Sequence, residues 1–228
     1  MTRASNLWHS REQATTKLTE ECPEVVVVLG ELLSLLDECG SALFTVDSAF
    51  GRVSALTVAK SRNLALGCYS LALDSLAQES GALFRPLIET LELLKYFRLY
   101  PHRVDEAIQD GPPKAGRIAQ LIGSEHKRLR EYFNEFASHL SLSPQALRHL
   151  LDLSSESFVE LRMQQPFRLS VALVNLQVLY SFLSLIGIEA VRCTQAAECA
   201  KSIDLAKRME DLRYRGQAVF DEARSHLD

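Results

Sequence analysis

The sequence predicts an all-α fold, a mostly antiparallel bundle of about seven or eight helices around one central apolar helix at about residues 167–192. Residues 169–188 carry no charge, and their apolar side chains cover every side of a helical wheel. We therefore expect other helices to surround this segment. Other stretches repeat apolar residues at intervals of three and four, which is typical of amphipathic helices. The one run with strand propensity, Val25–Val28, has no obvious partner strand, and we interpret it as helix.

The composition is that of an ordinary globular protein, with 47% hydrophobic and 24% charged residues. We expect a single all-helical domain over residues 1–228. The net charge of −4 and the pI of 5.9 argue against general attraction to nucleic acid or to anionic membranes. The five cysteines form no C-x-x-C pair, and no histidines stand at zinc-ligand spacing. We therefore expect no disulfide framework, no metal site and no cofactor.

The N-terminal residues lack the apolar core of a signal peptide, so we expect a cytoplasmic protein. Length alone would also allow residues 169–188 to span a membrane. Against that interpretation, Asn175 and Gln177 lie in the middle of the segment, and the remaining amphipathic helices need a soluble partner for their apolar stripes. We favour a buried bundle helix over a membrane span.

Start and stop signals place the helices of the first half. Ser10 and Gln13 stand at the spacing of a capping box, so a helix should begin at about residue 11. Pro23 favours the first turn of a second helix, which Gly40 should end. Lys60 interrupts the apolar stripe of the third segment, which is either one long helix or a helix broken between Lys60 and Arg62. The predicted ranges are about residues 11–22, 23–38, 47–77 and 82–100, with a turn at residues 78–81.

The most evident break in the first half of the chain lies at its end, before the helices of the second half. Pro101 and the Gly-Pro-Pro segment at residues 110–116 mark loops on either side of a short helix, and we interpret this region as a flexible lid. Ser143, followed by a proline, should open another short helix. Thr194 should cap the final helix. The predicted ranges are about residues 117 or 124 to 140, 143–153, 167–192 and 194–225, with residues 154–166 irregular.

One cluster of polar residues shares a face of the helix predicted at residues 82–100. Arg85, Glu89, Glu92 and Tyr96 are spaced so that they lie opposite the apolar stripe. One interpretation is a solvated ladder of ion pairs, which contributes little to stability. The other is that another helix covers this face, so that Arg85 and Glu89 form a buried pair that orients another group. Arginine before glutamate is the less favourable order for a local pair, which favours the second interpretation.

A second cluster lies on the next long predicted helix. Lys127, Arg128 and Arg130 are the densest positive charge in the chain. They could contact phosphates, and they also fit a solvated helix face. His139 follows Tyr132 by seven residues and lies beside the apolar stripe. A histidine there is either a hydrogen-bonded residue at the edge of the core or a titratable group in a cleft.

The segments Ser80–Glu89 and Tyr132–His139 resemble the arginine–glutamate and tyrosine–serine–histidine signatures of bacterial all-helical domains similar to the HEPN superfamily. The resemblance covers about residues 55–142. That superfamily includes RNases of toxin–antitoxin and phage-defence systems, in which an arginine and a histidine a few residues apart on one helix act on RNA at a dimer interface.

The resemblance implies roles for the two clusters. His139 would be the general acid or base, and Lys127, Arg128 and Arg130 would hold phosphates. Arg85, Glu89 and Tyr132 would not touch the RNA and would hold these residues in position.

The sequence departs from the HEPN pattern where the arginine should precede His139. Residues 132–134 read Tyr-Phe-Asn, and Arg130 is too far away. Arg3 and His9 have the right spacing, but no helix is predicted over them. A non-catalytic helical module fits this departure better than a nuclease does.

Our first expectation for function is therefore an interaction or regulatory module that binds a protein partner or forms a homodimer. The alternative is a HEPN-like RNA-binding protein or metal-independent RNase, with a role in a toxin–antitoxin or phage-defence system. The sequence contains no P-loop, no nucleophile elbow and no H-E-x-x-H motif. Whether the chain is an enzyme stays open at this stage.

Overall fold

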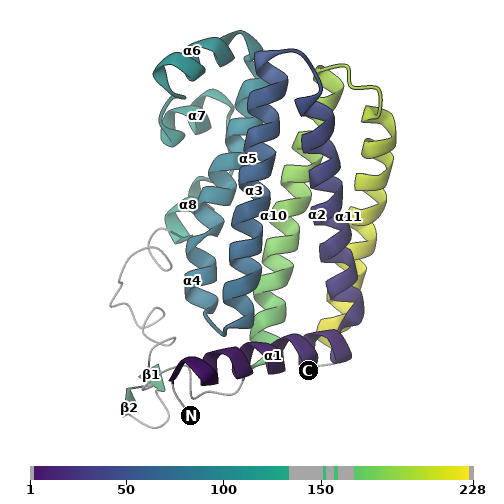
Figure 1. Cartoon of the computed structure of the whole chain (residues 1–228). Helices are drawn as coiled ribbons and strands as arrows, with labels where there is room; N and C mark the ends of the chain where they lie inside the picture. Colours follow the sequence, from purple (N-terminus) through teal and green to yellow (C-terminus); the bar gives the residue numbers. More distant parts are fainter. Residues whose placement is uncertain (1–2, 134–150, 153–156, 159–166, 226–228) are drawn as a thin grey trace.

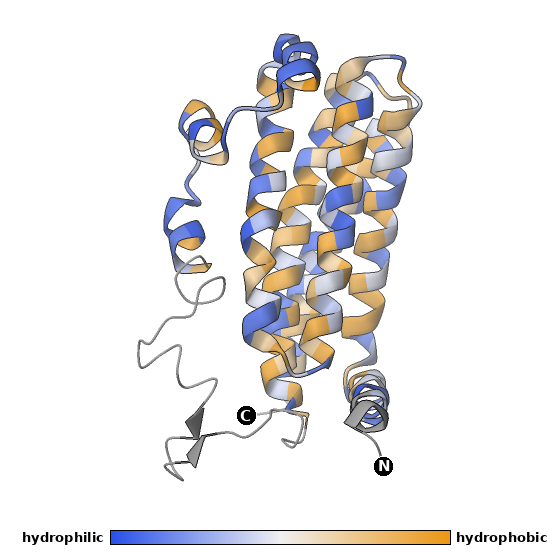
Figure 2. Cartoon of the chain, turned by 60° about the vertical axis from the view of Figure 1, so that its left-hand side comes forward, coloured by the Kyte–Doolittle hydropathy of each residue, from blue (hydrophilic) through white to orange (hydrophobic). Residues whose placement is uncertain are grey.

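A computed structural model describes residues 3–133, 151–152, 157–158 and 167–225, and in these residues the protein has the predicted all-α, multi-helix fold. Five long helices, α2, α3, α5, α10 and α11, stand side by side, and α1 lies across one end of them (Figure 1). The hydrophobic residues concentrate on the long helices (Figure 2). In chain order the elements are α1 (Arg3–Glu21), α2 (Pro23–Phe44), α3 (Ala49–Leu73), α4 (Ala77–Ala82), α5 (Phe84–Leu99), the 3-10 helix η1 (Pro101–Arg103), α6 (Val104–Asp110), α7 (Ala115–Leu121), α8 (Lys127–Phe133), β1 (Leu151–Asp152), β2 (Ser157–Phe158), α10 (Leu169–Ala196) and α11 (Ser202–Ser225).

Local chemistry sets the sharp connection between α2 and α3. Pro23 opens α2, as predicted, because the first turn of a helix does not need its missing amide. The Ser48 hydroxyl accepts a hydrogen bond from the Gly51 amide at 2.9 Å and caps α3. A Cβ atom at Gly51 would lie 2.7 Å from the carbonyl oxygen of Leu43. Only glycine therefore allows α3 to begin this close to the end of α2.

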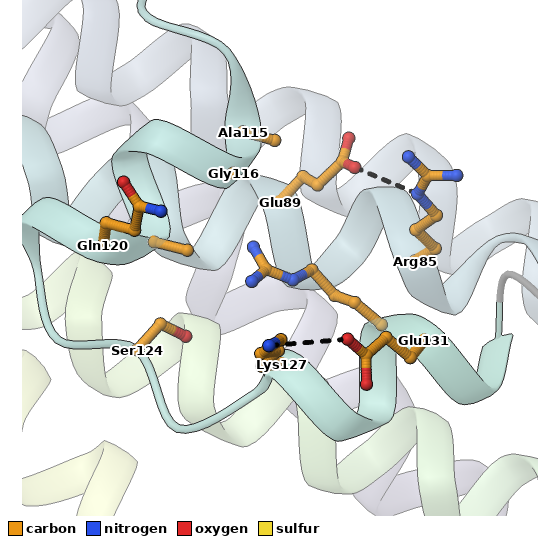
Figure 3. A pocket seen from close by; sticks show the side chains of 10 residues that line it. Arg85, Glu89, Ala115, Gly116, Gln120, Ser124, Lys127 and Glu131 are labelled. Carbon is orange, nitrogen blue, oxygen red and sulfur yellow. Dashed lines mark hydrogen bonds and ion pairs between the residues drawn. The ribbon is translucent and has the colours of Figure 1, made fainter.

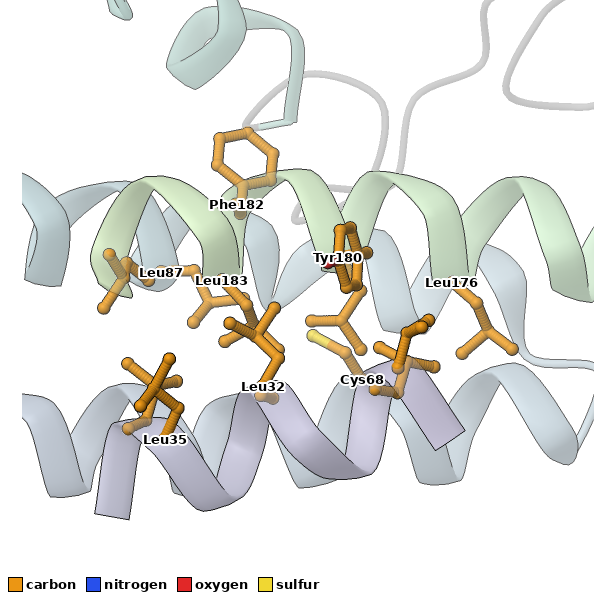
Figure 4. Close-up of a cluster of buried hydrophobic side chains, with 14 of the residues drawn as sticks. Leu32, Leu35, Cys68, Leu87, Leu176, Tyr180, Phe182 and Leu183 are labelled. Carbon is orange, nitrogen blue, oxygen red and sulfur yellow. The ribbon is translucent and has the colours of Figure 1, made fainter. Parts of the chain in front are cut away.

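α10 is the central helix of the bundle, as predicted, and packs against α2, α3, α5 and α11. Leu173, Leu176 and Leu183 of α10 are fully buried. In Figure 4, Leu176 and Leu183 extend into the space between α10 and α2, where Leu32 also lies. Each such side chain contributes about 1.5–3 kcal/mol when it leaves water. The stability of the bundle therefore depends strongly on this face of α10.

The expectation that α10 has no exposed face is wrong for one side of the helix. α5 and α11 flank α10, and α2 and α3 cover it from the front in the view of Figure 1, so that among the residues that the structure describes no long helix packs on its remaining side. Val171, Val174 and Leu185 on that side are 42%, 48% and 37% exposed. We define the open stripe as the exposed and partly exposed residues along this side: Val171, Val174, Val178, Ser181, Leu185, Ile188 and Arg192.

Two glycines let α10 and α11 pack closely. A Cβ atom at Gly216 of α11 would overlap the ring of Tyr180, and one at Gly187 of α10 would overlap the end of the Met209 side chain. The Tyr180 hydroxyl donates a hydrogen bond to the carbonyl of Leu212, so the ring is fixed across the interface. A larger residue at Gly216 must displace the hydrogen-bonded Tyr180 ring, whereas at Gly187 the flexible end of the Met209 side chain must move aside.

A second, smaller hydrophobic cluster lies where α7 packs against α5 and α6 packs against α3. Gly123 has a φ of +60° and follows the end of α7. A left-handed residue at this point stops a helix, so the alternative in which one helix runs on from residue 117 is wrong, and the start predicted at about residue 124 lies close to the start of α8. The described part of α8 ends at Phe133. The cluster consists of Tyr96, Phe97, Val104, Ile118 and Ile122.

The first helix begins earlier than the capping box at Ser10 predicts, because α1 already includes Arg3. Arg11 of α1 forms an ion pair with Asp74 and donates a hydrogen bond to the carbonyl of Ser70 at 3.0 Å. These contacts join α1 to the end of α3. Tertiary contacts thus stabilise a helix whose start the local signal placed too late.

Other predicted boundaries are also wrong. α2 continues through Gly40, because this glycine lies against Val58 of α3 rather than at a helix end. The turn predicted at residues 78–81 is part of α4, whereas α3 is one long helix with no break near Lys60, the first of the two alternatives. Thr194 is buried within α10 and bonds to the carbonyl of Val191, so α11 begins only at Ser202.

The region predicted as a short helix at residues 143–153 is described only at its end. Leu151 and Asp152 form a strand that pairs antiparallel with Ser157 and Phe158. The predicted start of that helix, at Ser143, lies outside the described residues. Within residues 154–166, otherwise interpreted as irregular, the sequence also predicts an extended piece at residues 158–163; Phe158 is in a strand, and residues 159–163 lie outside the described residues.

By length and composition alone, α10 is the one described helix that could cross a membrane. In its most apolar window, 56% of the residues are buried inside the bundle. The core helix of a soluble protein passes the same test, so the observation carries little weight for a membrane span.

Candidate functional site

An open polar pocket of about 480 Å³ lies between α5, α7 and α8 (Figure 3). Three elements supply its walls because the loop after Gly123 folds α8 back along α5. We use the name polar pocket for this site. Its lining residues are Arg85, Glu89, Ala115, Gly116, Ala119, Gln120, Ser124, Lys127, Arg130 and Glu131.

A buried carboxylate beside the polar pocket holds its walls together. Glu92 of α5 is 2% exposed and accepts a hydrogen bond from Arg130 of α8 at 2.6 Å. It also accepts one from the hydroxyl of Ser124, which lies in the loop before α8. Buried charges need such partners, because an uncompensated carboxylate in the interior is costly. Glu92 therefore fixes both the loop and α8 on α5.

Aromatic contacts fix the other end of α8 on the bundle. The Phe133 ring lies 5.3 Å from the Phe84 ring of α5 and 6.2 Å from the Phe182 ring of α10, measured between centroids. Tilted and edge-to-face pairs at such distances add about 0.5–1.5 kcal/mol to the burial of the rings. α8 is thus attached by an ion pair at one turn and by aromatic packing at another.

The remaining charges of the polar pocket form two ion pairs within single helices. Arg85 and Glu89 of α5 lie 3.1 Å apart and are half-buried. Lys127 and Glu131 of α8 lie 3.9 Å apart and are both exposed. Arg130 forms the third ion pair, with Glu92, so each positive charge of the pocket has a negative neighbour. The lining of the pocket is strongly polar, with three cations and two carboxylates, and the buried Glu92 beside it balances the third cation.

Four of the predicted site residues, Arg85, Glu89, Lys127 and Arg130, line this one pocket. The two clusters, which are far apart in sequence, therefore meet. Glu92 and Tyr96, on the same face of α5, are buried under other elements, so that face is not simply a solvated ladder. Arg85 and Glu89 remain partly exposed.

The other predicted site residues do not line the polar pocket. Arg128 is exposed on α8. Tyr132 is 55% exposed, and its ring packs edge-on against the Phe133 ring at 5.4 Å. His139 lies outside the described residues. His9, of the pair that matched the HEPN spacing, is on α1, so a helix does cover that pair, and the ring is exposed beside Glu12.

Several residues of the polar pocket were not predicted from the sequence. Glu131 follows Lys127 by four residues, a spacing that does indicate an ion pair on one helix face. Gln120, Ser124 and Gly116 carry no comparable signal, because their place depends on the turn at Gly123. The buried pair of Glu92 and its arginine joins residues 38 positions apart, which no local pattern reveals.

The described residues offer few groups for nucleophilic or metal chemistry. Burial raises the pKa of the thiols of Cys39, Cys68 and Cys193 to about 12. At neutral pH these thiols stay protonated, and a protonated thiol is a poor nucleophile. Among the residues that the structure describes, no group of three or more His, Cys, Asp or Glu side chains could hold a metal ion.

No family model, no curated protein and no solved structure matches this chain. The geometry of the polar pocket and of the bundle is therefore the basis for assigning a function.

Proposed function

We propose that this chain is a cytoplasmic interaction module that uses the polar pocket to bind a polypeptide segment carrying charges of both signs, without a cofactor. The charge balance of the pocket is the observation that carries the proposal. Three cations and two carboxylates line the pocket, and each cation is paired with a carboxylate, the third of which is Glu92, buried beside the pocket. A partner with charges of one sign would be attracted by some of these groups and repelled by the others.

The three ion pairs differ in how easily a partner can compete with them. Arg130 and Glu92 are buried, and drawing the arginine away would leave the carboxylate uncompensated at a cost of about 3–5 kcal/mol. Lys127 is 79% exposed and lies 3.9 Å from Glu131, and exposed pairs contribute about 1 kcal/mol or less. In this proposal a partner exchanges contacts with Lys127 and Glu131, while Arg130 keeps α8 in place.

RNA is the second candidate partner, because Lys127 and Arg128 are adjacent exposed cations at the start of α8. Contacts of such residues with phosphates supply most of the non-specific affinity for nucleic acid. The resemblance to HEPN-like domains implies the same role for them, with His139 as the catalytic group. The balanced charges of the neighbouring pocket favour the polypeptide.

A random peptide library displayed on phage tests the proposal. After selection on the wild-type protein, the affinity of the best peptide is measured by calorimetry for wild type, Lys127→Glu and Lys207→Glu. Lys207 is an exposed lysine of α11 outside the pocket and serves as the matched control. We expect Lys127→Glu to weaken binding about tenfold or more and Lys207→Glu to leave it unchanged. Failure to select any peptide, or equal losses in both variants, would reject the pocket as the binding site.

Binding of a fluorescent single-stranded RNA, followed by anisotropy at low and high salt, tests the second candidate. Phosphate contacts predict affinity that falls steeply with added salt and is lost in the Lys127→Glu, Arg128→Glu double variant. Metal-free incubation on the same RNA, compared with His139→Ala, shows whether cleavage occurs. If the partner is a polypeptide, we expect neither salt-sensitive binding of the RNA nor cleavage of the RNA.

A further inference from the structure

The open stripe of α10 has the spacing of a helix-packing surface. Its seven residues follow one another at intervals that alternate between three and four, from Val171 to Arg192. Five of the seven are apolar, although the stripe faces outward. Apolar residues at these alternating intervals form the seam along which one α-helix packs on another. A second helix is therefore the occupant that this surface fits.

A row of polar residues on α11 borders the open stripe. Gln177 of α10 donates a hydrogen bond to Asp221 at 3.4 Å, and Arg224 donates one to the side-chain carbonyl of Gln177 at 3.0 Å. These contacts show that this side of α11 lies next to the uncovered side of α10. We define the charged row as five exposed residues at intervals of three, four, four and three: Glu210, Arg213, Gln217, Asp221 and Arg224.

The open stripe and the charged row have their centres at one level of the bundle. Ser181 is the middle residue of the stripe, and Gln217 is the middle residue of the row. The contact between Gln177 and Asp221 joins residues four positions away from each centre, on helices that run antiparallel. The two centres therefore lie side by side, and one twofold axis can pass close to both.

Rotation about that axis makes the stripe complementary to itself. Ser181 meets Ser181 of the second copy, and a small residue at the crossing point lets two helices approach closely. Val178 then faces Leu185 of the second copy, and Val174 faces Ile188. Every apolar residue near the centre thus meets another apolar residue.

The same rotation makes the charged row complementary to itself. Glu210 faces Arg224 of the second copy, and Arg213 faces Asp221, so opposite charges meet in both cases. Gln217 at the centre meets Gln217. Such borders of charged residues beside an apolar seam determine which helices pair and in which direction.

We propose that the chain forms a twofold homodimer in which the open stripe and the charged row of one copy pack antiparallel against the same surfaces of the second copy. The inference rests on the proposed role as an interaction module and names the second copy as one partner. A helix face from residue 171 to 192 is about 32 Å long. The open stripe and the shorter charged row beside it are each about 10–12 Å wide, so together they measure roughly 600 Å² per copy. A contact of that size falls at the lower end of specific, stable interfaces.

Exchange of the two charges tests the pairing without touching the core. Arg213→Glu places two glutamates opposite the Asp221 side chains of the other copy, and we expect the dissociation constant of the dimer to rise about tenfold or more. The double variant Arg213→Glu, Asp221→Arg should restore dimerisation, because each reversed charge meets its opposite again. Sedimentation equilibrium distinguishes the dimer from the 25.5 kDa chain. A wild-type protein that stays monomeric at high micromolar concentration would overturn the proposal.

A disulfide at the axis tests the register. In Ser181→Cys, two identical thiols should meet and form a covalent dimer on mild oxidation. Ser34→Cys is the matched control, because Ser34 is also an exposed helix serine whose hydroxyl bonds to the carbonyl four residues earlier at 2.9 Å. We expect the covalent dimer only in the first variant. Equal cross-linking of both variants would overturn the register.

A third substitution separates a dimer from other occupants of the open stripe. Leu185→Glu should raise the dissociation constant about a hundredfold, while Leu66→Glu on α3, at a similar exposure of 40%, should not change it. Photo-cross-links from position 185 that reach only residues 134–166 of the same chain would replace the second copy by that segment.

A monomer that still binds peptide in the polar pocket would reject the dimer alone. A dimer that binds no peptide would reject the role of the pocket and keep the dimer.

Discussion

α10 and α11 are neighbouring long helices that face water in different ways. The exposed side of α11 carries charged residues, and Arg208 and Arg215 reach across to Glu38 and Glu31 of α2. The exposed side of α10 carries valine, leucine and isoleucine, and Arg192 is the only charged residue of the open stripe. Position in the bundle alone cannot explain this difference, because both helices have one uncovered side. A helix that remains apolar where it is exposed has a second packing surface.

The strongest test of the comparison contrasts the two sides of α10. Leu179 is 2% exposed on the packed side, and Leu179→Asp buries an unpaired charge, so we expect a loss of about 4 kcal/mol or more and little soluble protein. Val174→Asp, on the open stripe, should change the unfolding free energy of the monomer by less than about 1 kcal/mol. Urea unfolding at several protein concentrations measures both. Equal losses at the two sites would show that the open stripe is not a separate surface.

The close packing between α10 and α11 gives the next largest effect. Gly216→Ala forces a methyl group against the buried ring of Tyr180, and we expect it to lower the unfolding free energy by about 2–3 kcal/mol. Gly30→Ala is the control, because no atom lies within 4 Å of the added carbon. That change should stabilise α2 by up to about 1 kcal/mol, since alanine has the higher helix propensity. Thermal unfolding of both variants checks the sign of each effect.

Tyr180 also makes the α10–α11 interface sensitive to alkaline pH. Burial raises its pKa from 10 to about 12, so the folded protein keeps a proton that the unfolded chain releases. Its contribution is complete below pH 10 and is lost as the pH rises to 12, which amounts to about 2–3 kcal/mol. Urea midpoints between pH 9 and 12 should fall less steeply for Tyr180→Phe than for wild type. Parallel curves would contradict the role of Tyr180.

The exposed side of α11 should give the smallest effect. Arg208 lies 2.6 Å from Glu38, and both side chains are nearly half exposed. A double-mutant cycle of Arg208→Ala and Glu38→Ala should give a coupling energy below about 1 kcal/mol, decreasing with added salt. A coupling as large as the loss at Leu179 would mean that ion pairs, and not apolar packing, hold α11 in place.

The sequence was sufficient to predict the elements that rest on long apolar repeats. α10 was predicted because its apolar run is long and uninterrupted, and α2 because Pro23 and the leucines after it are strong local signals. Boundaries failed where tertiary contacts replace local signals. Gly40 would end a helix in isolation, but here it lies against Val58 within α2. Local patterns do not contain that information.

The polar pocket was predictable only in parts. Arg85 with Glu89, and Lys127 with the following residues of α8, could be recognised because each group lies within one helix. Their meeting depends on the left-handed turn at Gly123 and on the buried contact of Glu92 with α8. The open stripe was missed because an apolar helix was assumed to be covered on all sides. Only the arrangement of its neighbours shows which side stays exposed.

The division of the apolar residues into two clusters has a consequence for local unfolding. The small cluster under α6 and α7 is separate from the main core, so this part can open while the long helices stay folded. Backbone amides of α7 should therefore exchange with deuterium faster than those of α10. Because α7 also forms one wall of the polar pocket, a bound partner must hold it closed. Slower exchange in α7 thus reports occupancy of the pocket by any partner, whatever its chemical nature.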